Sequence, residues 1–107
     1  MTEANNPRVA VITGGGNGIG RATATLFAQH GYAVAVWDTS EAAGAEAVQA
    51  IAAAGGVAVF HRVDVSKPAS AVEAATAVRA RFGRIDALIN NAGIVRDAQL
   101  VKVRDGK

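Results

Sequence analysis

Short apolar runs alternate with longer segments of mixed polarity along most of the chain, which is the pattern of strands that alternate with helices. The first run, Val9-Ala10-Val11-Ile12, is continuously apolar, as expected of a strand buried on both faces. Strands are predicted over Arg8–Ile12, Ala33–Trp37, Val57–Val63 and Ile85–Ile89. Because strands that alternate with helices form parallel sheets, the chain is predicted to have an α/β fold.

The segments between these strands have the signals that begin and end helices. The three helices are predicted over 18–30, 40–54 and 66–82. Ser40 provides a cap for the second helix, and Ser66 with Pro68 opens the third. A glycine follows each helix, at the position where a left-handed conformation ends it.

Each predicted helix carries apolar residues at helical spacing, and these residues mark the side expected to face the sheet. They are Ile19, Ala22, Leu26 and Phe27 in the first helix, Val48 and Ile51 in the second, and Val72, Ala75, Val78 and Phe82 in the third.

A glycine-rich turn follows the first predicted strand, where residues 13–20 spell Thr-Gly-Gly-Gly-Asn-Gly-Ile-Gly. Glycines permit positive φ and close approach of a ligand to the backbone, and the N-terminus of the following helix attracts an anion. The dinucleotide spacing G-x-G-x-x-G is absent, and Gly14, Gly18 and Gly20 give T-G-x-x-x-G-x-G instead. Taken alone, the turn is either a phosphate site or a structural turn.

A turn of this kind, combined with right-handed crossovers, predicts a Rossmann-like parallel sheet whose strands, numbered along the chain, lie in the order 3-2-1-4. The first two helices then cover one face of the sheet and the third helix covers the other. The glycine turn lies where the strand order reverses, which is where ligands bind in open α/β sheets.

An acid ends the second predicted strand. Asp38 lies eighteen residues after Gly20, and a carboxylate there accepts hydrogen bonds from both hydroxyls of an adenosine ribose. It also repels a 2′-phosphate, and the next residue, Thr39, offers no positive charge to attract one. This interpretation predicts NAD in preference to NADP. The alternative is that Asp38 merely caps the second helix.

Polar residues also follow the third and fourth strands. Asp64-Val65 comes after the third strand, and taken alone Asp64 fits a helix cap as well as a ligand contact. Asn90-Asn91-Ala92-Gly93 comes after the fourth strand. Its amides can tie the loop to neighbouring strands, and its two small residues leave room for a ligand against the backbone.

These motifs, over residues 8 to 105, resemble the short-chain dehydrogenase/reductase family. The resemblance implies a dinucleotide cofactor, with Asp64 on the adenine amino group, Val65 on the ring and Asn91 near a ribose, while Asn90 is structural and Asp86 fixes a loop. The implied cofactor-binding residues are Gly14, Gly16, Asn17, Gly18, Ile19, Gly20, Asp38, Asp64, Val65, Asn91, Ala92 and Gly93. Residues 94–100 are most similar to the branch that reduces 3-oxoacyl thioesters.

The family's catalytic residues have no counterpart here. Its proton transfer needs a Ser, a Tyr and a Lys four residues after that Tyr, whereas the single tyrosine, Tyr32, has Val36 four residues on. We therefore expect residues 1–107 to be one incomplete NAD(P)-binding domain, the N-terminal half of an oxidoreductase, truncated before a fifth strand. It would act on a carbonyl or alcohol only when complemented. The alternatives are a non-catalytic dinucleotide-binding module and an inactive remnant.

Composition argues against several other functions. The net charge of +2 with scattered Arg and Lys argues against nucleic acid, and the absence of cysteine excludes disulfides and thiolate zinc sites. The two isolated histidines do not suggest a metal site. The polar N-terminus and the short apolar runs predict a cytoplasmic chain without a membrane span. A bare edge at the fourth strand predicts self-association or pairing with a C-terminal fragment.

Overall fold

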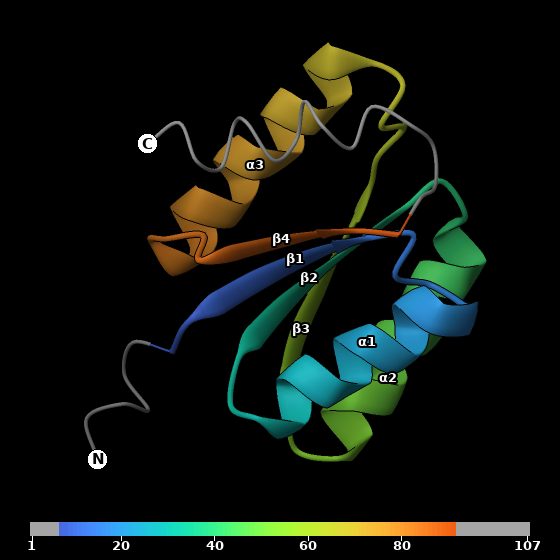
Figure 1. Ribbon diagram of the computed structural model, residues 1–107, viewed down its shortest axis with the longest axis vertical. Coiled ribbons are helices and arrows are strands. Elements are labelled where there is room, and N and C mark those ends of the chain that lie inside the picture. The colour runs from blue at the N-terminus through green and yellow to red at the C-terminus, as the bar shows by residue number, and fades with distance from the viewer. Residues whose placement is uncertain (1–6, 92–107) are drawn as a thin grey trace.

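The computed structural model describes residues 7–91, which form a four-stranded parallel sheet with helices on both faces (Figure 1). The elements are β1 (Val9–Thr13), α1 (Gly18–Gln29), β2 (Ala33–Asp38), α2 (Glu41–Ala53), β3 (Val57–Arg62), α3 (Pro68–Phe82) and β4 (Ala87–Asn90). The order across the sheet is β3-β2-β1-β4. The α/β fold and the 3-2-1-4 order predicted from the sequence are both confirmed.

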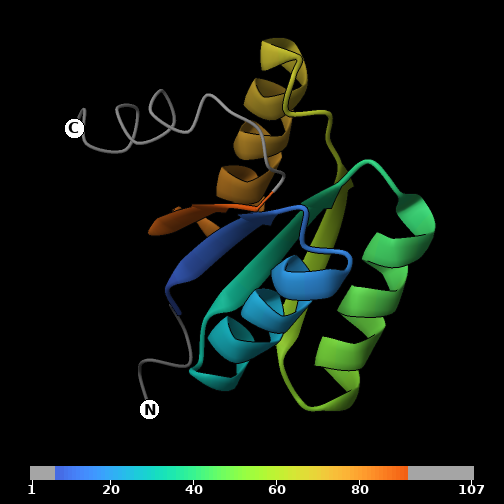
Figure 2. The same cartoon turned by 45° about the vertical axis from the view of Figure 1, so that its right-hand side comes forward.

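The two faces of the sheet have separate apolar cores. α1 and α2 lie together on one face, and α3 covers the other as its one helix within residues 7–91 (Figure 2). The core under α1 and α2 contains Ala10, Ile12, Ala24, Val34, Val36, Ala47 and Ile51. The core under α3 contains Val9, Val11, Ala33, Ala35, Trp37, Val63, Ala74 and Val78. Since every residue of β1 is buried, this strand holds the turn that follows it in a fixed position.

The predicted inward sides of the first and third helices were partly wrong. Ile19 is 78% exposed, and Ala22 and Leu26 are also exposed, whereas Gly20 and Ala24 are the buried residues of α1. Val72 in α3 is 64% exposed, and its neighbour Ala74 is buried instead. The physical reason is close packing, because small side chains let a helix approach the sheet, and the larger apolar side chains one or two positions away are then turned outward.

The helix boundaries differ from the prediction by one or two residues, as α2 shows, which spans Glu41–Ala53 between its caps Ser40 and Ala54. The N-cap of α3 is Lys67 rather than Ser66, although Pro68 does occupy the first turn. The first helix ends at Gln29, with His30 as its C-cap. The cap of α2 is confirmed, because the Ser40 hydroxyl accepts a hydrogen bond from Ala43 N at 3.1 Å.

Asp86 fastens the start of β4 to the start of β1. Its Oδ2 accepts a hydrogen bond from Val9 N at 2.8 Å, and its own N–H donates to Val9 O at 2.8 Å. Arg84 donates to both carboxylate oxygens, with distances from 2.8 to 3.1 Å. Asp86 therefore fixes the entry to β4, as the family resemblance implies.

Asp86→Asn is expected to lower the free energy of unfolding by about 1 kcal/mol at pH 7, because it weakens charge-assisted hydrogen bonds in a partly solvated pair. The hydrogen bonds from Arg84 and Val9 hold the pKa of Asp86 below its usual value. A lowered folded-state pKa gives stability that is present above the unfolded pKa and is lost as pH falls through the folded one. The difference between wild type and Asp86→Asn should therefore shrink on acidification.

Urea unfolding at pH 7 and near pH 3 measures this difference. Glu73→Gln is a matched control, because Glu73 is an exposed acid on α3. A wild-type advantage over Asp86→Asn that persists unchanged at low pH would contradict the role given to the Asp86 charge.

Candidate dinucleotide-binding site

The glycine turn connects β1 to α1 at the carboxyl end of the sheet. Gly14 and Gly18 have φ of 64° and 60°, so the left-handed conformation that favours glycine occurs at both ends of the turn. Asn17, the N-cap of α1, makes no side-chain capping hydrogen bond, and the first helical turn contains no acid. The positive end of the helix is therefore not neutralised by its own side chains, and it favours an anion there.

Two glycines of the turn, Gly20 and Gly18, have different structural roles. A Cβ on Gly20 would overlap the carbonyl of Gly14, so Gly20 lets α1 pack closely against the turn. A Cβ on Gly18 would meet no atom within 4 Å. Gly20 is thus needed by the fold, whereas Gly18 borders open space at the start of the helix.

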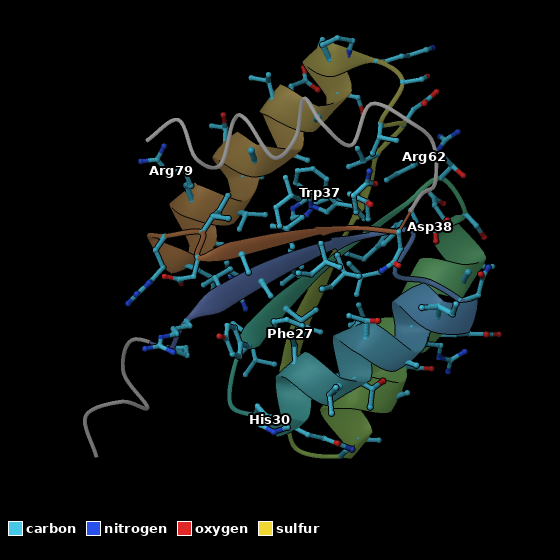
Figure 3. All side chains as sticks on the ribbon, viewed as in Figure 1. Phe27, His30, Trp37, Asp38, Arg62 and Arg79 are labelled. Atoms are coloured by element: carbon cyan, nitrogen blue, oxygen red, sulfur yellow. The ribbon has the colours of Figure 1, made fainter. Side chains whose placement is uncertain are left out.

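Asp38 ends β2 beside this turn (Figure 3). Its Oδ2 accepts a hydrogen bond from Gly16 N at 3.0 Å, and its Oδ1 accepts one from Ser40 N at 3.0 Å. The cap of α2 is Ser40, so the alternative in which Asp38 caps that helix does not hold. Trp37, the preceding residue, is 5% exposed and packs between the sheet and α3.

Asp64 and Val65 lie in the loop between β3 and α3. The Asp64 Oδ1 accepts hydrogen bonds from the Ser66 hydroxyl at 2.6 Å and from Ser66 N at 3.0 Å. These bonds lower the pKa of Asp64, and the bond from the Ser66 hydroxyl has the larger effect. Because Lys67 is the N-cap of α3, the alternative of Asp64 as the helix cap does not hold either. Val65 is 38% exposed, which leaves an apolar surface beside the carboxylate.

The two asparagines after Ile89 have different surroundings. The Thr13 hydroxyl donates to Asn90 Oδ1 at 2.8 Å, which ties the end of β4 to the end of β1. Asn91 N donates to the Thr13 hydroxyl oxygen at 2.9 Å. The Asn91 Nδ2 is buried, and within residues 7–91 it has no hydrogen-bond partner. Ala92 and Gly93, which also belong to the predicted site, lie outside the described residues.

The sheet brings these groups to one edge. Thr13 pairs in register with Trp37 on one side and with Asn90 on the other, so the turn, Asp38 and the asparagines follow adjacent strand ends. Thr13 was not assigned a role from the sequence, although it opens the glycine motif and is 1% exposed. A buried threonine at the end of an apolar strand is the sequence signal that indicates a hydrogen bond to the end of a neighbouring strand.

The structure adds two observations on other chemistry. Within residues 7–91, no group of three or more His, Cys, Asp or Glu side chains is placed to hold a metal ion. None of the helices in this part of the chain is both long enough and apolar enough to cross a membrane.

Comparisons with known proteins agree with the geometry. The family model described as short chain dehydrogenase matches residues 8–107. A 3-oxoacyl-[acyl-carrier-protein] reductase FabG of Chlamydia muridarum is 40% identical over 92% of this chain and 40% of its own length.

Two solved structures are similar to this chain in both fold and sequence. A metagenomic short-chain oxidoreductase in complex with NADP has a TM-score of 0.78 and 36% identity, covering 84% of this chain and 41% of its own. A short chain dehydrogenase/reductase from Burkholderia phymatum in complex with NAD has a TM-score of 0.75 and 39% identity, covering 82% and 31%. The chain spans 34–40% of the length of the curated relatives that it matches first. Its matched family, fold and strand-end motifs place it in the short-chain dehydrogenase family.

Proposed function

We propose that this chain binds NAD(H) at the carboxyl edge of its sheet, as the N-terminal part of an oxidoreductase that acts on a carbonyl or hydroxyl group. The observation that carries the proposal is the open space at Gly18, at the positive end of α1, in the same turn whose Gly16 N donates to the Asp38 carboxylate. The buried, unpartnered Nδ2 of Asn91 fits the same ligand, because it needs a hydrogen-bond acceptor that residues 7–91 do not supply.

Each group of proposed binding residues contacts a different part of the cofactor. The turn, with Gly14, Gly16, Asn17, Gly18 and Gly20, would hold the pyrophosphate at the start of α1. Asp38 would accept the adenosine ribose hydroxyls, Asp64 and Val65 would contact the adenine, and Asn91 with Ala92 and Gly93 would lie along a ribose. Ile19, exposed on the first turn of α1, offers an apolar surface to the cofactor.

The cofactor, when bound, supplies the hydride, and the residues of this chain bind and orient it. No Ser, Tyr and Lys set for proton transfer occurs in the sequence, so we propose that residues 1–107 alone are inactive. The similarity to the FabG reductase favours a 3-oxoacyl thioester as the substrate class of a whole protein. A coding sequence that continues to Tyr-x-x-x-Lys supports the enzyme, and a stop after Lys107 supports a non-catalytic binding module.

NADH is expected to bind at least about tenfold more tightly than NADPH, because the Asp38 carboxylate accepts ribose hydroxyls and repels a 2′-phosphate. Asp38→Ala should reduce this difference between the affinities for NADH and NADPH. Titration of the fluorescence of each reduced cofactor measures both affinities. Glu41→Gln removes the exposed charge of the first residue of α2 and keeps the Asp38 carboxylate, and it should leave the ratio of the two affinities largely unchanged. Equal or tighter NADPH binding by the wild type contradicts the assignment.

We also propose that the 107-residue chain associates through β4, either with a second copy or with a C-terminal fragment. Across residues 7–91, β4 has a neighbouring strand on one side only, and all four of its residues are partly exposed. An apolar strand edge of this kind pairs readily with another strand.

A further inference from the structure

The end of β2 supplies two successive hydrogen-bond acceptors to the glycine turn. The first is a main-chain carbonyl, because Gly15 N donates to Trp37 O at 3.2 Å. The next carbonyl, Asp38 O, accepts from Val63 N on the β3 side at 3.1 Å. The next N–H of the turn, that of Gly16, bonds to the Asp38 carboxylate instead. The backbone of β2 therefore bonds to the first of these turn amides, and the Asp38 side chain bonds to the second.

The turn is packed tightly at this point. A Cβ on Gly16 would lie 2.8 Å from Asp38 Oδ2 and 2.8 Å from Ala43 Cβ, at the start of α2. The other oxygen of Asp38 is held by Ser40 N. The carboxylate is therefore fixed at both oxygens, between the turn after β1 and the loop after β2.

These hydrogen bonds leave room for a ligand. A carboxylate has about four lone-pair sites, and the two backbone N–H groups occupy two of them. The remaining sites can accept ribose hydroxyls while the bond to Gly16 stays in place.

We infer that Asp38 is a positioning residue for the phosphate-binding turn, in addition to its proposed ribose contact, and this inference rests on the proposed function. By bonding Gly16 N before a ligand arrives, it keeps the turn in its binding conformation and reduces the ordering that binding requires. This role predicts an effect opposite in sign to simple electrostatics. Removing a negative charge beside a pyrophosphate should strengthen binding, whereas loss of the positioning bond should weaken it.

ADP and 2′,3′-dideoxy-ADP separate the two roles, because only ADP has the hydroxyls that Asp38 would accept. Isothermal titration of each nucleotide should show that Asp38→Ala binds dideoxy-ADP about tenfold more weakly than the wild type. Asp38→Asn keeps an oxygen that accepts from Gly16 N, and it should restore most of that affinity. Glu41→Gln is the matched charge control. Unchanged or tighter dideoxy-ADP binding by Asp38→Ala overturns the inference.

Amide hydrogen exchange of the ligand-free chain tests the same bond without any nucleotide. Gly16 should exchange about tenfold faster in Asp38→Ala than in the wild type, while Gly15, which bonds to a backbone carbonyl, keeps its rate. An unchanged Gly16 rate overturns the inference. A wild type that binds neither nucleotide overturns the proposed function instead, and the Gly16 rate then decides whether Asp38 holds the turn.

Discussion

Gly18→Val is expected to lower the affinity for NADH by at least about a hundredfold while the fold survives. A valine there would fill the open space at the start of α1, where the pyrophosphate is proposed to approach the backbone. It would also force a β-branched residue into a φ of 60°, which costs about 1–2 kcal/mol of stability. Fluorescence titration measures the affinity, and thermal unfolding measures the fold.

Gly55→Val separates the two effects of that substitution. Gly55 also has a positive φ, of 93°, and open space around its Cβ direction, but it follows α2 and precedes β3, at the amino end of that strand. Its valine variant should lose similar stability and keep NADH binding. If Gly18→Val binds NADH as the wild type does, the cofactor lies elsewhere or the turn has only a structural role.

The 107-residue chain is expected to be largely dimeric or larger at concentrations of about 100 μM, a range in which weak strand pairing becomes populated. The driving surface is the edge of β4 together with the apolar side chains around it that are only partly buried. On the α3 face these are Phe82, Ile85 and Leu88, and on the other face they are Ala87 and Ile89. Size-exclusion chromatography with light scattering over a range of concentrations measures the association.

Two lysine variants identify the edge that is used. Ala87 in β4 and Ala58 in β3 are both partly buried on the face covered by α1 and α2, and they belong to opposite edges of the sheet. A lysine on an edge strand blocks pairing. Ala87→Lys should therefore return the chain to a monomer, and Ala58→Lys should not. A wild type that stays monomeric at high concentration, with slow amide exchange in β4, contradicts the proposal.

The sheet and its order were predictable because their signals are local. Val9 to Ile12 is apolar without interruption, and the glycines after it both end the strand and identify its place at the centre of the sheet. Asp86 was assigned to a loop-fixing role through the family motif, and its bonds to Val9 are consistent with that role. Signals that lie within one strand, one turn or one motif were thus sufficient for the topology.

The buried faces of the helices and the side-chain contacts of the site depend instead on how the elements pack against one another. Ile19 and Val72 fit a helical apolar spacing, yet they face outward because Gly20 and Ala74 allow closer packing. The bond between Asp38 and Gly16 joins residues 22 positions apart in the chain, and no sequence pattern indicates it. Ser66 has the side chain of a helix cap, but it bonds to Asp64 instead. When a side chain has several possible partners in the sequence, the packing of the elements decides which one it contacts.

A nuclear magnetic resonance titration of the ¹⁵N-labelled chain with NADH shows whether the cofactor binds at the carboxyl ends of the strands, because it locates the ligand without requiring activity. We expect saturable shifts confined to the amides of residues 14–20, Asp38, Asp64–Val65 and Asn91–Gly93, with Gly55, at the amino end of β3, unchanged. Shifts centred on any other face of the sheet, or no shifts at millimolar NADH, would contradict the claim that this edge is a dinucleotide site.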